Sequence, residues 1–265
     1  MNPCELMDAV RHIAFGAGRK ILDVYEQGFT VTDKEDRSPL TEADRLSNEF
    51  IVHELENLTP DIPVLSEESA PAAPETRRGW SQFWLVDPLD GTKEFISRNG
   101  EFTVNIALID GDRPVLGVVY VPMVGVCYSA CRGGGAFKQK SECRPDPIRA
   151  RAFAGGKPIV MASRSHAGPE TAAFLASLGA HDTVTMGSSL KACLVAEGTA
   201  DLYPRLGPTM EWDTAAAQCV VEEAGGRVLD AQGRPLTYNK PTLRNPWFIV
   251  CGAGNTDWVR HLPGS

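Results

Sequence analysis

Apolar residues recur every three or four positions near the start of the chain, which is typical of an amphipathic helix. Asn2 before Pro3 indicates a helix start, because asparagine caps free amides and proline suits the first turn. Gly28 follows the last apolar position and is a typical helix end. We therefore predict a first helix up to Gly28, with an apolar face formed by Leu6, Val10, Ile13, Ala17, Ile21 and Val24.

A second amphipathic helix is predicted from about Glu42 to Leu58. Thr41, three residues before Asp44, resembles a capping box, in which each side chain bonds a backbone amide of the other residue. Residues 29–40 carry mixed charges and Pro39, so we expect a strand or hairpin that leads into a loop. The apolar face of this second helix is formed by Leu46, Phe50, Ile51 and Leu55.

The middle third of the chain changes to short β-prone runs separated by turn residues. Asp110-Gly111 joins two of these runs and is typical of a hairpin turn. We expect one sheet with the two helices packed on it. The predicted strands cover residues 63–65, 83–86, 102–109, 115–121 and 126–130.

Strands and helices alternate in the last part of the chain, which favours an α/β layer arrangement. The predicted strands cover residues 159–162, 184–186 and 200–203, and the predicted helices cover residues 169–178, 189–196 and 214–224. Residues 143–156 are rich in Pro, Arg and Gly and lack periodicity. We therefore predict an N-terminal α+β domain of residues 1–150 and a C-terminal α/β domain of residues 151–265.

Composition and charge narrow the classes of function. Hydrophobic residues make up 43% and charged residues 23% of the 265 residues, as in ordinary globular proteins. A net charge of −8 argues against a nucleic-acid polymer as the main partner. No stretch approaches the ~20 apolar residues that span a bilayer, and the N-terminus has no signal-peptide core. We expect a cytoplasmic protein.

The seven cysteines are scattered along the chain, and none forms a C-x-x-C pair. This distribution suggests neither a zinc site nor a disulfide framework. We expect the cysteines to act as small buried apolar residues in a reducing compartment.

The apolar run that ends at Val86 leads directly into a cluster of carboxylates. Asp87 follows the run, Pro88 restricts Asp87 to an extended conformation, and Asp90 comes three residues later. Gly91 then opens a predicted short helix, whose free amides suit a phosphate oxygen. Two carboxylates this close repel each other unless a cation lies between them, and Mg²⁺ prefers oxygen ligands.

Further acids lie elsewhere in the chain, and each has a purely structural interpretation. Glu67 and Glu68 could be solvated loop charges, Asp44 only a helix cap, and Asp213 a complement to a helix dipole. Their joint occurrence with the Asp87 cluster favours metal chemistry.

Three segments together resemble the inositol monophosphatase superfamily. Residues 84–92 (WLVDPLDGT) and 212–216 (WDTAA) are similar to its two signature motifs, and residues 65–69 (LSEES) match its first acidic segment. Residues 90–95, 163–166, 187–191, 200–205 and 207–209 are similar to the CysQ-type 3′(2′),5′-bisphosphate nucleotidases within it. Met210-Glu211 departs from that pattern, where less acidic residues are expected. The resemblance implies a fold of alternating α-β-α-β-α layers.

The resemblance also implies an activity and its metal ions. It implies a phosphatase that converts 3′-phosphoadenosine 5′-phosphate (PAP) to AMP and phosphate and supports sulfate assimilation. One Mg²⁺ is expected on Glu67, Asp87 and the Leu89 carbonyl, and another on Asp87, Asp90 and Asp213, with two or three ions per site. Such ions can activate a water molecule and clamp the reacting oxygens.

Catalytic and substrate roles also follow from the resemblance. Glu67 and Thr92 are expected to orient the attacking water. Asp44 is expected to accept a hydrogen bond from the Thr92 hydroxyl and so to hold it in place. Arg164 and His166 are secondary candidates for substrate contact, and Trp212 is expected in the core. The residues expected to contact substrate are Glu67, Leu89, Asp90, Gly91, Thr92, Asp213, Ser188, Ser189 and Lys191.

Alternatives remain open at this point. An inositol monophosphatase or sugar-bisphosphate phosphatase could use the same scaffold, and a magnesium-binding scaffold protein would require a missing ligand, which the sequence does not show. The resemblance further implies inhibition by lithium. It leaves open a weak contact with the cytoplasmic face of the inner membrane, and periodicity does not reveal the oligomeric state.

Overall fold

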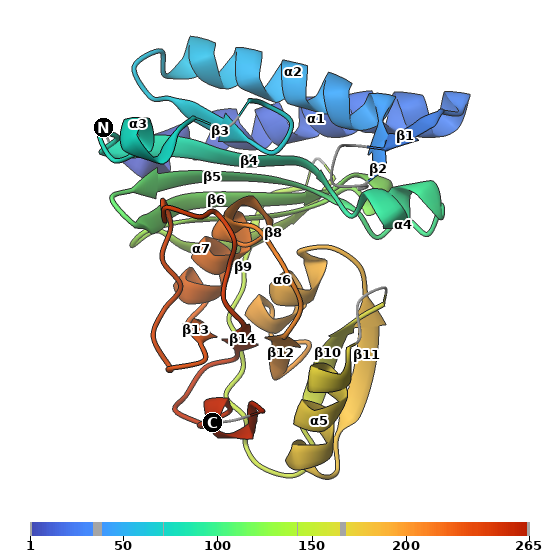
Figure 1. The fold of residues 1–265 in the computed structure, drawn as a ribbon, viewed down its shortest axis with the longest axis vertical. Coiled ribbons are helices and arrows are strands. Elements are labelled where there is room, and N and C mark those ends of the chain that lie inside the picture. The colour runs from blue at the N-terminus through green and yellow to red at the C-terminus, as the bar shows by residue number, and fades with distance from the viewer. Residues whose placement is uncertain (1, 34–38, 71, 142, 165–167, 264–265) are drawn as a thin grey trace.

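The computed structural model describes residues 2–33, 39–70, 72–141, 143–164 and 168–263. Helices and two sheets alternate in layers along the long axis of the molecule (Figure 1). Helices α1 (Met7–Gln27) and α2 (Glu42–Leu58) cover one face of a seven-stranded sheet. Helices α6 (Leu190–Ala196) and α7 (Ala215–Glu223) lie between that sheet and a five-stranded one, and α5 (Pro169–Leu178) lies beyond it. The predicted α-β-α-β-α layers are confirmed.

The two N-terminal helices begin and end where the sequence predicts. Asn2 accepts a hydrogen bond from the Cys4 amide, and a 3₁₀ turn, η1 (Pro3–Leu6), precedes α1. Gly28 ends α1 with a φ of 89°, a conformation that glycine adopts readily. Thr41 and Asp44 form the predicted capping box of α2. Between the helices, β1 (Val31–Asp33) and β2 (Pro39–Thr41) pair as an antiparallel hairpin.

The seven-stranded sheet is antiparallel except for the pairing of β3 with β4. Its strands follow the chain in order, and all five predicted strands of this region are present. Strands β8 and β9 were not predicted, because they contain few apolar residues. The one-turn helix α3 (Pro74–Arg77) was not predicted either. The strands are β3 (Val64–Ser66), β4 (Gln82–Asp90), β5 (Thr103–Asp110), β6 (Arg113–Val121), β7 (Val126–Cys131), β8 (Gly135–Lys140) and β9 (Asp146–Pro147).

The five-stranded sheet is mixed, in the order β11-β10-β12-β14-β13. The strand pair β10 and β11 is parallel, and β14 runs antiparallel to both of its neighbours. Strands β13 and β14 follow the last predicted element in the chain, so neither was predicted. The strands are β10 (Ile159–Ser163), β11 (Asp182–Met186), β12 (Leu202–Arg205), β13 (Arg227–Asp230) and β14 (Phe248–Cys251). The division into two domains near residue 150 stays a prediction.

Strand β4 shows how one strand serves two cores. Phe83 and Leu85 pack in the core between the two sheets, whereas Trp84 and Val86 pack in the core under α1 and α2. This alternation follows from the two-residue period of a strand. Because both faces are covered, the strand is a continuous apolar run, which is the pattern seen in the sequence.

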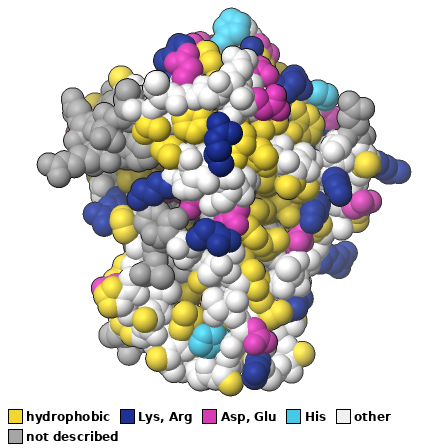
Figure 2. All heavy atoms as spheres, turned by 90° about the vertical axis from the view of Figure 1, so that its right-hand side faces the viewer, with side chains coloured by type: hydrophobic (Ala, Val, Ile, Leu, Met, Phe, Trp, Pro, Cys, Tyr) yellow, Lys and Arg dark blue, Asp and Glu magenta, His cyan; other side chains and the backbone are white. Residues whose placement is uncertain are grey.

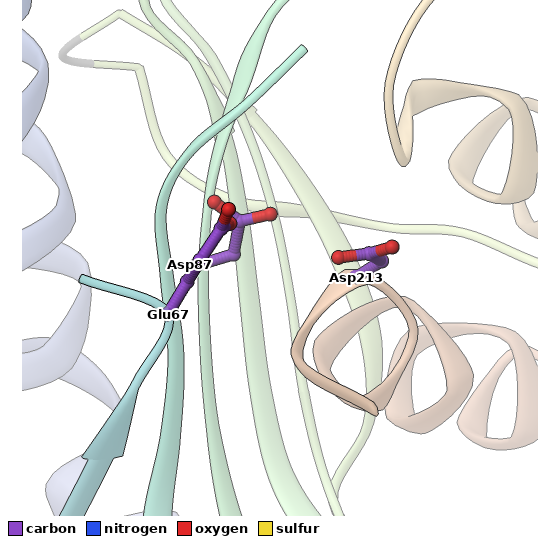
Figure 3. A group of neighbouring side chains, drawn as sticks. All are labelled: Glu67, Asp87 and Asp213. Carbon is purple, nitrogen blue, oxygen red and sulfur yellow. The ribbon is translucent and has the colours of Figure 1, made fainter. Parts of the chain in front are cut away.

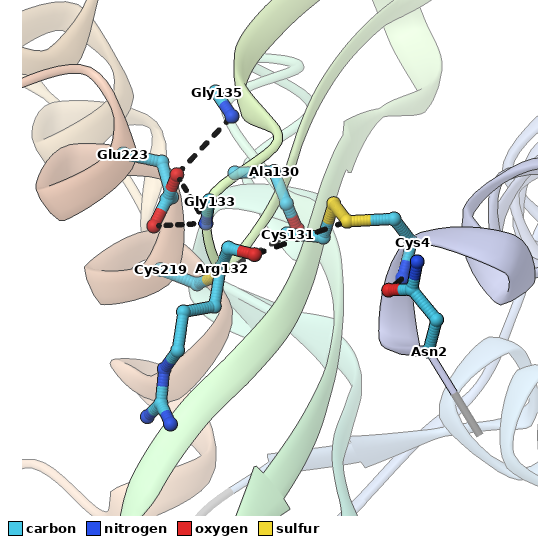
Figure 4. Close-up of a disulfide and its surroundings, with 9 residues drawn as sticks. All are labelled: Asn2, Cys4, Ala130, Cys131, Arg132, Gly133, Gly135, Cys219 and Glu223. Carbon is cyan, nitrogen blue, oxygen red and sulfur yellow. Dashed lines mark hydrogen bonds between the residues drawn. A yellow bond between two sulfur atoms is a disulfide. The ribbon is translucent and has the colours of Figure 1, made fainter.

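A disulfide contradicts the prediction that the cysteines form none. Cys4 of η1 is bonded to Cys131 at the end of β7, with Cα atoms 5.4 Å apart (Figure 4). The prediction failed because these residues are 127 positions apart, and only the packing of η1 on the sheet brings them together. Of the remaining cysteines, four are buried as predicted and Cys143 is exposed.

One face of the molecule shows how its charged side chains are distributed. On the face in Figure 2, Lys and Arg side chains are interspersed with Asp and Glu, so neither charge gathers there in one patch. Within the part of the chain that the structure describes, no helix has the length and apolar character to cross a membrane.

Candidate active site

A cavity of about 300 Å³ lies where the two halves of the chain meet, and it collects most of the predicted site residues. Segments from both sheets and from the starts of α4 (Thr92–Ile96), α6 and α7 line it. The predicted residues that line the cavity are Glu67, Asp87, Leu89, Asp90, Gly91, Thr92, Ser188, Ser189, Lys191 and Asp213.

Strand β4 delivers two carboxylates to the cavity through an irregularity in its pairing. The register with β5 shifts between Asp87 and Asp90, so β4 continues to Asp90 instead of ending at Val86 as predicted. Leu89 packs in the core under α2, the same side as Val86, although strict alternation would place it on the opposite face. The slip in phase therefore returns Asp90 to the cavity side, where Asp87 already lies.

Three carboxylates form a compact cluster in the cavity. Oxygen atoms of Glu67, Asp87 and Asp213 all lie within 4.8 Å of one another. Figure 3 shows Glu67 and Asp87 side by side, with Asp213 facing them from the turn before α7. Glu67 follows β3, and Asp213 ends the 3₁₀ helix η3 (Glu211–Asp213). Segments far apart in the sequence thus supply one acidic site.

Asp90 lies beside this cluster and is held by four hydrogen bonds. Its Oδ2 accepts from the Ser189 amide and hydroxyl, each at 2.6 Å, and from Thr103 and Asn105, each at 3.3 Å. The Ser189 hydroxyl also lies 2.6 Å from the Asp213 carbonyl oxygen. Ser189, predicted to bind substrate, therefore ties the two acidic segments together.

Asp44 and Thr92 adopt the arrangement that the sequence analysis expected. The Thr92 hydroxyl donates to Asp44 Oδ1 at 3.2 Å, and Asp44 Oδ2 accepts from the Thr41 amide and hydroxyl at 2.8 and 2.6 Å. The Thr92 hydroxyl also lies 3.5 Å from the Leu89 carbonyl oxygen. Gly91 precedes Thr92 with a φ of 94°, a left-handed conformation that suits glycine and starts α4.

The electrostatics of the cluster favour a bound cation. Burial, followed by the charges of Glu67 and Asp90, raises the pKa of Asp87 well above its usual range. Burial and the charge of Asp90 likewise raise the pKa of Asp213. Protons would relieve this repulsion at low pH, and a cation would relieve it at neutral pH. A site made only of oxygen donors fits a hard divalent ion such as Mg²⁺.

Lys191 supplies positive charge to the same cavity. Its side chain is only 3% exposed, its ammonium lies 5.2 Å from the centre of the Tyr203 ring, and it donates to the Ser188 carbonyl. Burial lowers the pKa of Lys191 to about 8. A buried lysine next to acids suits recognition of an anionic group, which would favour its charged form.

The secondary candidates lie elsewhere. Arg164 forms a two-bond ion pair with Glu101, which also accepts from the Gly187 amide, so the guanidinium of Arg164 binds a protein carboxylate. His166 lies outside the described residues. Trp212 is partly buried against the core between the sheets, as predicted.

Tyr203 and Arg205 are among the residues that line the cavity but were not predicted as site residues. Both lie on β12 in a segment already noticed for its resemblance, and their two-residue spacing on a strand could have indicated a shared face. The buried Arg205 Nε has no hydrogen-bond partner among the described residues.

Comparison with known proteins decides the family. The model of the inositol monophosphatase family matches residues 3–247. The chain belongs to this family. A relative from Escherichia coli K12, named 3′(2′),5′-bisphosphate nucleotidase CysQ, is 51% identical over 92% of this chain and 99% of its own length. A relative of the same name from Haemophilus influenzae is 37% identical over 96% and 95% of the two chains.

Solved structures of inositol monophosphatase family members share the fold. CysQ from Bacteroides thetaiotaomicron is 47% identical with a TM-score of 0.80, covering 92% of this chain and 95% of that one. The extragenic suppressor protein suhB from Bartonella henselae is 28% identical with a TM-score of 0.78, covering 97% and 98%. Family members are generally metal-dependent, which agrees with the carboxylate cluster of Glu67, Asp87 and Asp213.

Proposed function

We propose that this protein is a magnesium-dependent 3′(2′),5′-bisphosphate nucleotidase that removes the 3′-phosphate of PAP, giving AMP and phosphate. The observation that carries the proposal is the pairing of a three-carboxylate cluster with a buried cation, Lys191, in one cavity. A substrate with two phosphates needs both features, one for the phosphate that reacts and one for the phosphate that stays. The names of the relatives that are about half identical support the same substrate class.

Two or three Mg²⁺ ions would be held by the cluster. Glu67, Asp87 and the Leu89 carbonyl would hold one ion, and Asp87, Asp90 and Asp213 another. When bound, the ions lower the pKa of the attacking water and offset the charge of the phosphate. All four of the hydrogen bonds described for Asp90 end on Oδ2, so Oδ1 would be the oxygen offered to an ion.

Thr92 and Asp44 have a defined part in orienting the attacking water. Because the Thr92 hydroxyl donates a hydrogen bond to Asp44, the lone pairs of its oxygen are left to accept a hydrogen bond from water. Glu67 would accept a second hydrogen bond from the same water and direct it at the phosphorus. The amides of Gly91 and Thr92 would bind the reacting phosphate. Such positioning supplies much of phosphoryl-transfer catalysis.

A comparison of substrates tests the proposal. Initial rates with Mg²⁺ should be higher on PAP than on inositol 1-phosphate or on a sugar bisphosphate, because only PAP places a second phosphate on a nucleoside. Faster turnover of the inositol ester would favour the alternative, an inositol monophosphatase or sugar-bisphosphate phosphatase on the same scaffold. Millimolar lithium should inhibit the reaction.

A single substitution tests the metal centre. Asp87→Asn should lower kcat on PAP by about a hundredfold to a thousandfold, the usual effect of losing one preorganised electrostatic group at the reacting centre. Arg234→Gln is the matched control, because this exposed arginine and its partner Asp230 lie outside the cavity. Activity of Asp87→Asn near that of the wild type would contradict the mechanism.

The proposed role extends to the cell. Removal of PAP would support sulfate assimilation, in a cytoplasmic enzyme for which weak contact with the inner membrane remains open. Deletion of the gene should make PAP accumulate during growth on sulfate, as measured by chromatography of cell extracts. Unchanged PAP levels would contradict this role.

A further inference from the structure

An ion pair between a buried carboxylate and a partly buried lysine lies next to the metal cluster without lining the cavity. Glu211 is 0% exposed and begins η3, whose last residue is Asp213. Its carboxylate accepts from the Lys240 ammonium at 2.6 Å, from the Lys240 amide at 3.1 Å and from the Asn239 amide at 2.7 Å. The pair therefore joins η3 to the loop of residues 237–245, which we call the anchor loop.

The anchor loop holds the turn that presents Asp213 at several further points. The Asn245 side chain donates to the Met210 carbonyl at 2.7 Å and to the Thr214 hydroxyl at 3.0 Å. The Met210 amide in turn donates to Asp213 Oδ2 at 2.9 Å. The anchor loop thus holds a residue on each side of Asp213, and the Met210 amide, within the same turn, holds one of its carboxylate oxygens.

The other end of the anchor loop reaches the segment that carries Glu67. Arg77, only 2% exposed, donates to Asn239 Oδ1 at 3.0 Å and to the Lys240 carbonyl at 3.1 Å. Its Nε donates to the Ala72 carbonyl at 3.1 Å, five residues after Glu67. The Asn239 amide group completes the link by donating to the Arg77 carbonyl at 2.9 Å.

Energetics argue that this network serves more than stability. A buried ion pair is often no more stabilising than apolar side chains of the same volume, because both charges lose their hydration. Directional bonds, in contrast, fix the position of the groups that they join. The network joins the two chain segments whose carboxylates must lie within 4.8 Å of each other.

We propose that the ion pair of Glu211 and Lys240, extended through Asn239 to Arg77, is a positioning device that sets the spacing of Asp213 from Glu67 for divalent metal binding. Glu211 and Lys240 are positioning residues, since neither lines the cavity. The inference rests on the metal-dependent function proposed above. It assigns a role to the acidic residue before Trp212 that stood out in the sequence.

Direct metal binding tests the device. Mn²⁺ is titrated by calorimetry into metal-free wild type, Glu211→Gln, Lys240→Met and the double variant. Each single variant should weaken Mn²⁺ binding by about tenfold, the usual effect of losing a group that orients metal ligands. The double variant should weaken Mn²⁺ binding by less than the product of the two single-variant effects, because both substitutions break the same interaction. At saturating Mg²⁺, KM for PAP should change by less than about twofold, because the substitutions leave the contacts that bind the substrate in place.

A matched control separates positioning from stability. Asp201 is also a buried carboxylate, which accepts from Arg151 at 2.8 and 2.6 Å and from the Ile159 amide at 2.7 Å, but it does not line the cavity. Asp201→Asn should lower the melting temperature and leave Mn²⁺ affinity unchanged. Equal losses of affinity in Asp201→Asn and Glu211→Gln would overturn the proposal, as would a Glu211→Gln protein that melts earlier but binds Mn²⁺ normally.

A milder variant covers the case in which Glu211→Gln does not fold. Asn239 has a φ of 61°, which glycine adopts readily, so Asn239→Gly keeps the backbone and removes only the bonds to Arg77. It should fold and lose Mn²⁺ affinity in the same direction, and unchanged affinity would overturn the proposal. Because calorimetry needs no substrate, a wild type that fails to hydrolyse PAP would refute the proposed function alone.

Discussion

Lys191 is a buried lysine in the same cavity as the carboxylate cluster, so its charge should control substrate affinity. Burial lowers its pKa to about 8, and it therefore loses its proton as the pH rises through that value. KM for PAP should rise above about pH 8, because the neutral amine attracts phosphate less. The measurement is KM against pH for the wild type and for Lys191→Met, whose KM should be high at every pH.

The control for Lys191 is a lysine at the surface. Lys140→Met removes an exposed charge and should keep the pH profile of the wild type. A profile for Lys191→Met that still bends near pH 8 would assign the titration to another group.

Single residues were predictable where a local motif determines the side chain's role. Asp87, Thr92 and Asp44 follow from a strand end, a helix start and a capping box, each visible within a few residues. The contacts of Glu211 and Arg77 were not predictable. Their shared partner, Lys240, lies 29 positions from Glu211 and 163 positions from Arg77, and only tertiary packing brings it close. The bond between Cys4 and Cys131 was missed for the same reason.

At the scale of elements, α7 packs on the sheet so closely that one strand residue must be glycine. A Cβ atom on Gly117 of β6 would lie 2.3 Å from the Ala216 carbonyl oxygen. Gly117→Ala should therefore destabilise the fold by about 1–3 kcal/mol, the usual cost of overpacking. It should also lower activity, since α7 begins beside Asp213. Urea unfolding and kcat measure the two effects.

Gly79→Ala is the control for this substitution. Its added Cβ would meet only the Thr76 carbonyl oxygen at 3.5 Å, an ordinary contact. If the two alanine variants unfold at the same urea concentration, the packing of α7 on β6 does not limit stability.

Elements with strong boundaries were predicted best. The bounds of α2 and α5 agree with the sequence analysis, because a capping box and a proline mark their starts. Strand β8 lacks the apolar run that a central strand shows, and its place in the sheet depends on pairing with β7 and β9. Pairing between distant strands leaves no local pattern in the sequence.

At the scale of the whole molecule, the disulfide ties the N-terminus to the seven-stranded sheet. It closes a loop of 127 residues, so its loss should lower the free energy of unfolding by about 2–5 kcal/mol. The melting temperature of Cys4→Ser should fall by several degrees, and dithiothreitol should have the same effect on the wild type. Cys143→Ser, at an exposed free cysteine, should melt like the wild type. Equal melting of all three proteins would mean that the bond does not form in solution.

The acidic cluster should make stability depend on pH and metal together. The raised pKa values of Asp87 and Asp213 mean that the metal-free fold holds protons which the unfolded chain releases. Its stability should therefore fall as the pH rises above the ordinary carboxylate range. Mg²⁺ should raise the melting temperature more at about pH 7.5 than at about pH 5.5, where protons compete for the same oxygens.

Asp87→Asn provides the comparison for this effect. It removes one carboxylate of the cluster, so its melting temperature should respond less to Mg²⁺ at either pH. An Asp87→Asn protein stabilised by Mg²⁺ as much as the wild type would place the ion elsewhere.

The slip in phase between Asp87 and Asp90 has a consequence for how this family can vary. A side-chain replacement at Pro88 or Leu89 alters packing but keeps Asp90 on the cavity side. Insertion of one residue here, with the slip retained, would turn the acid that follows towards α2, and deletion of one would remove the extra residue of the slip and move the acid one position closer to Asp87. Natural relatives should therefore show exchanges of residue type in this stretch but no change in its length, and a protein engineer should treat the number of residues here as part of the catalytic apparatus.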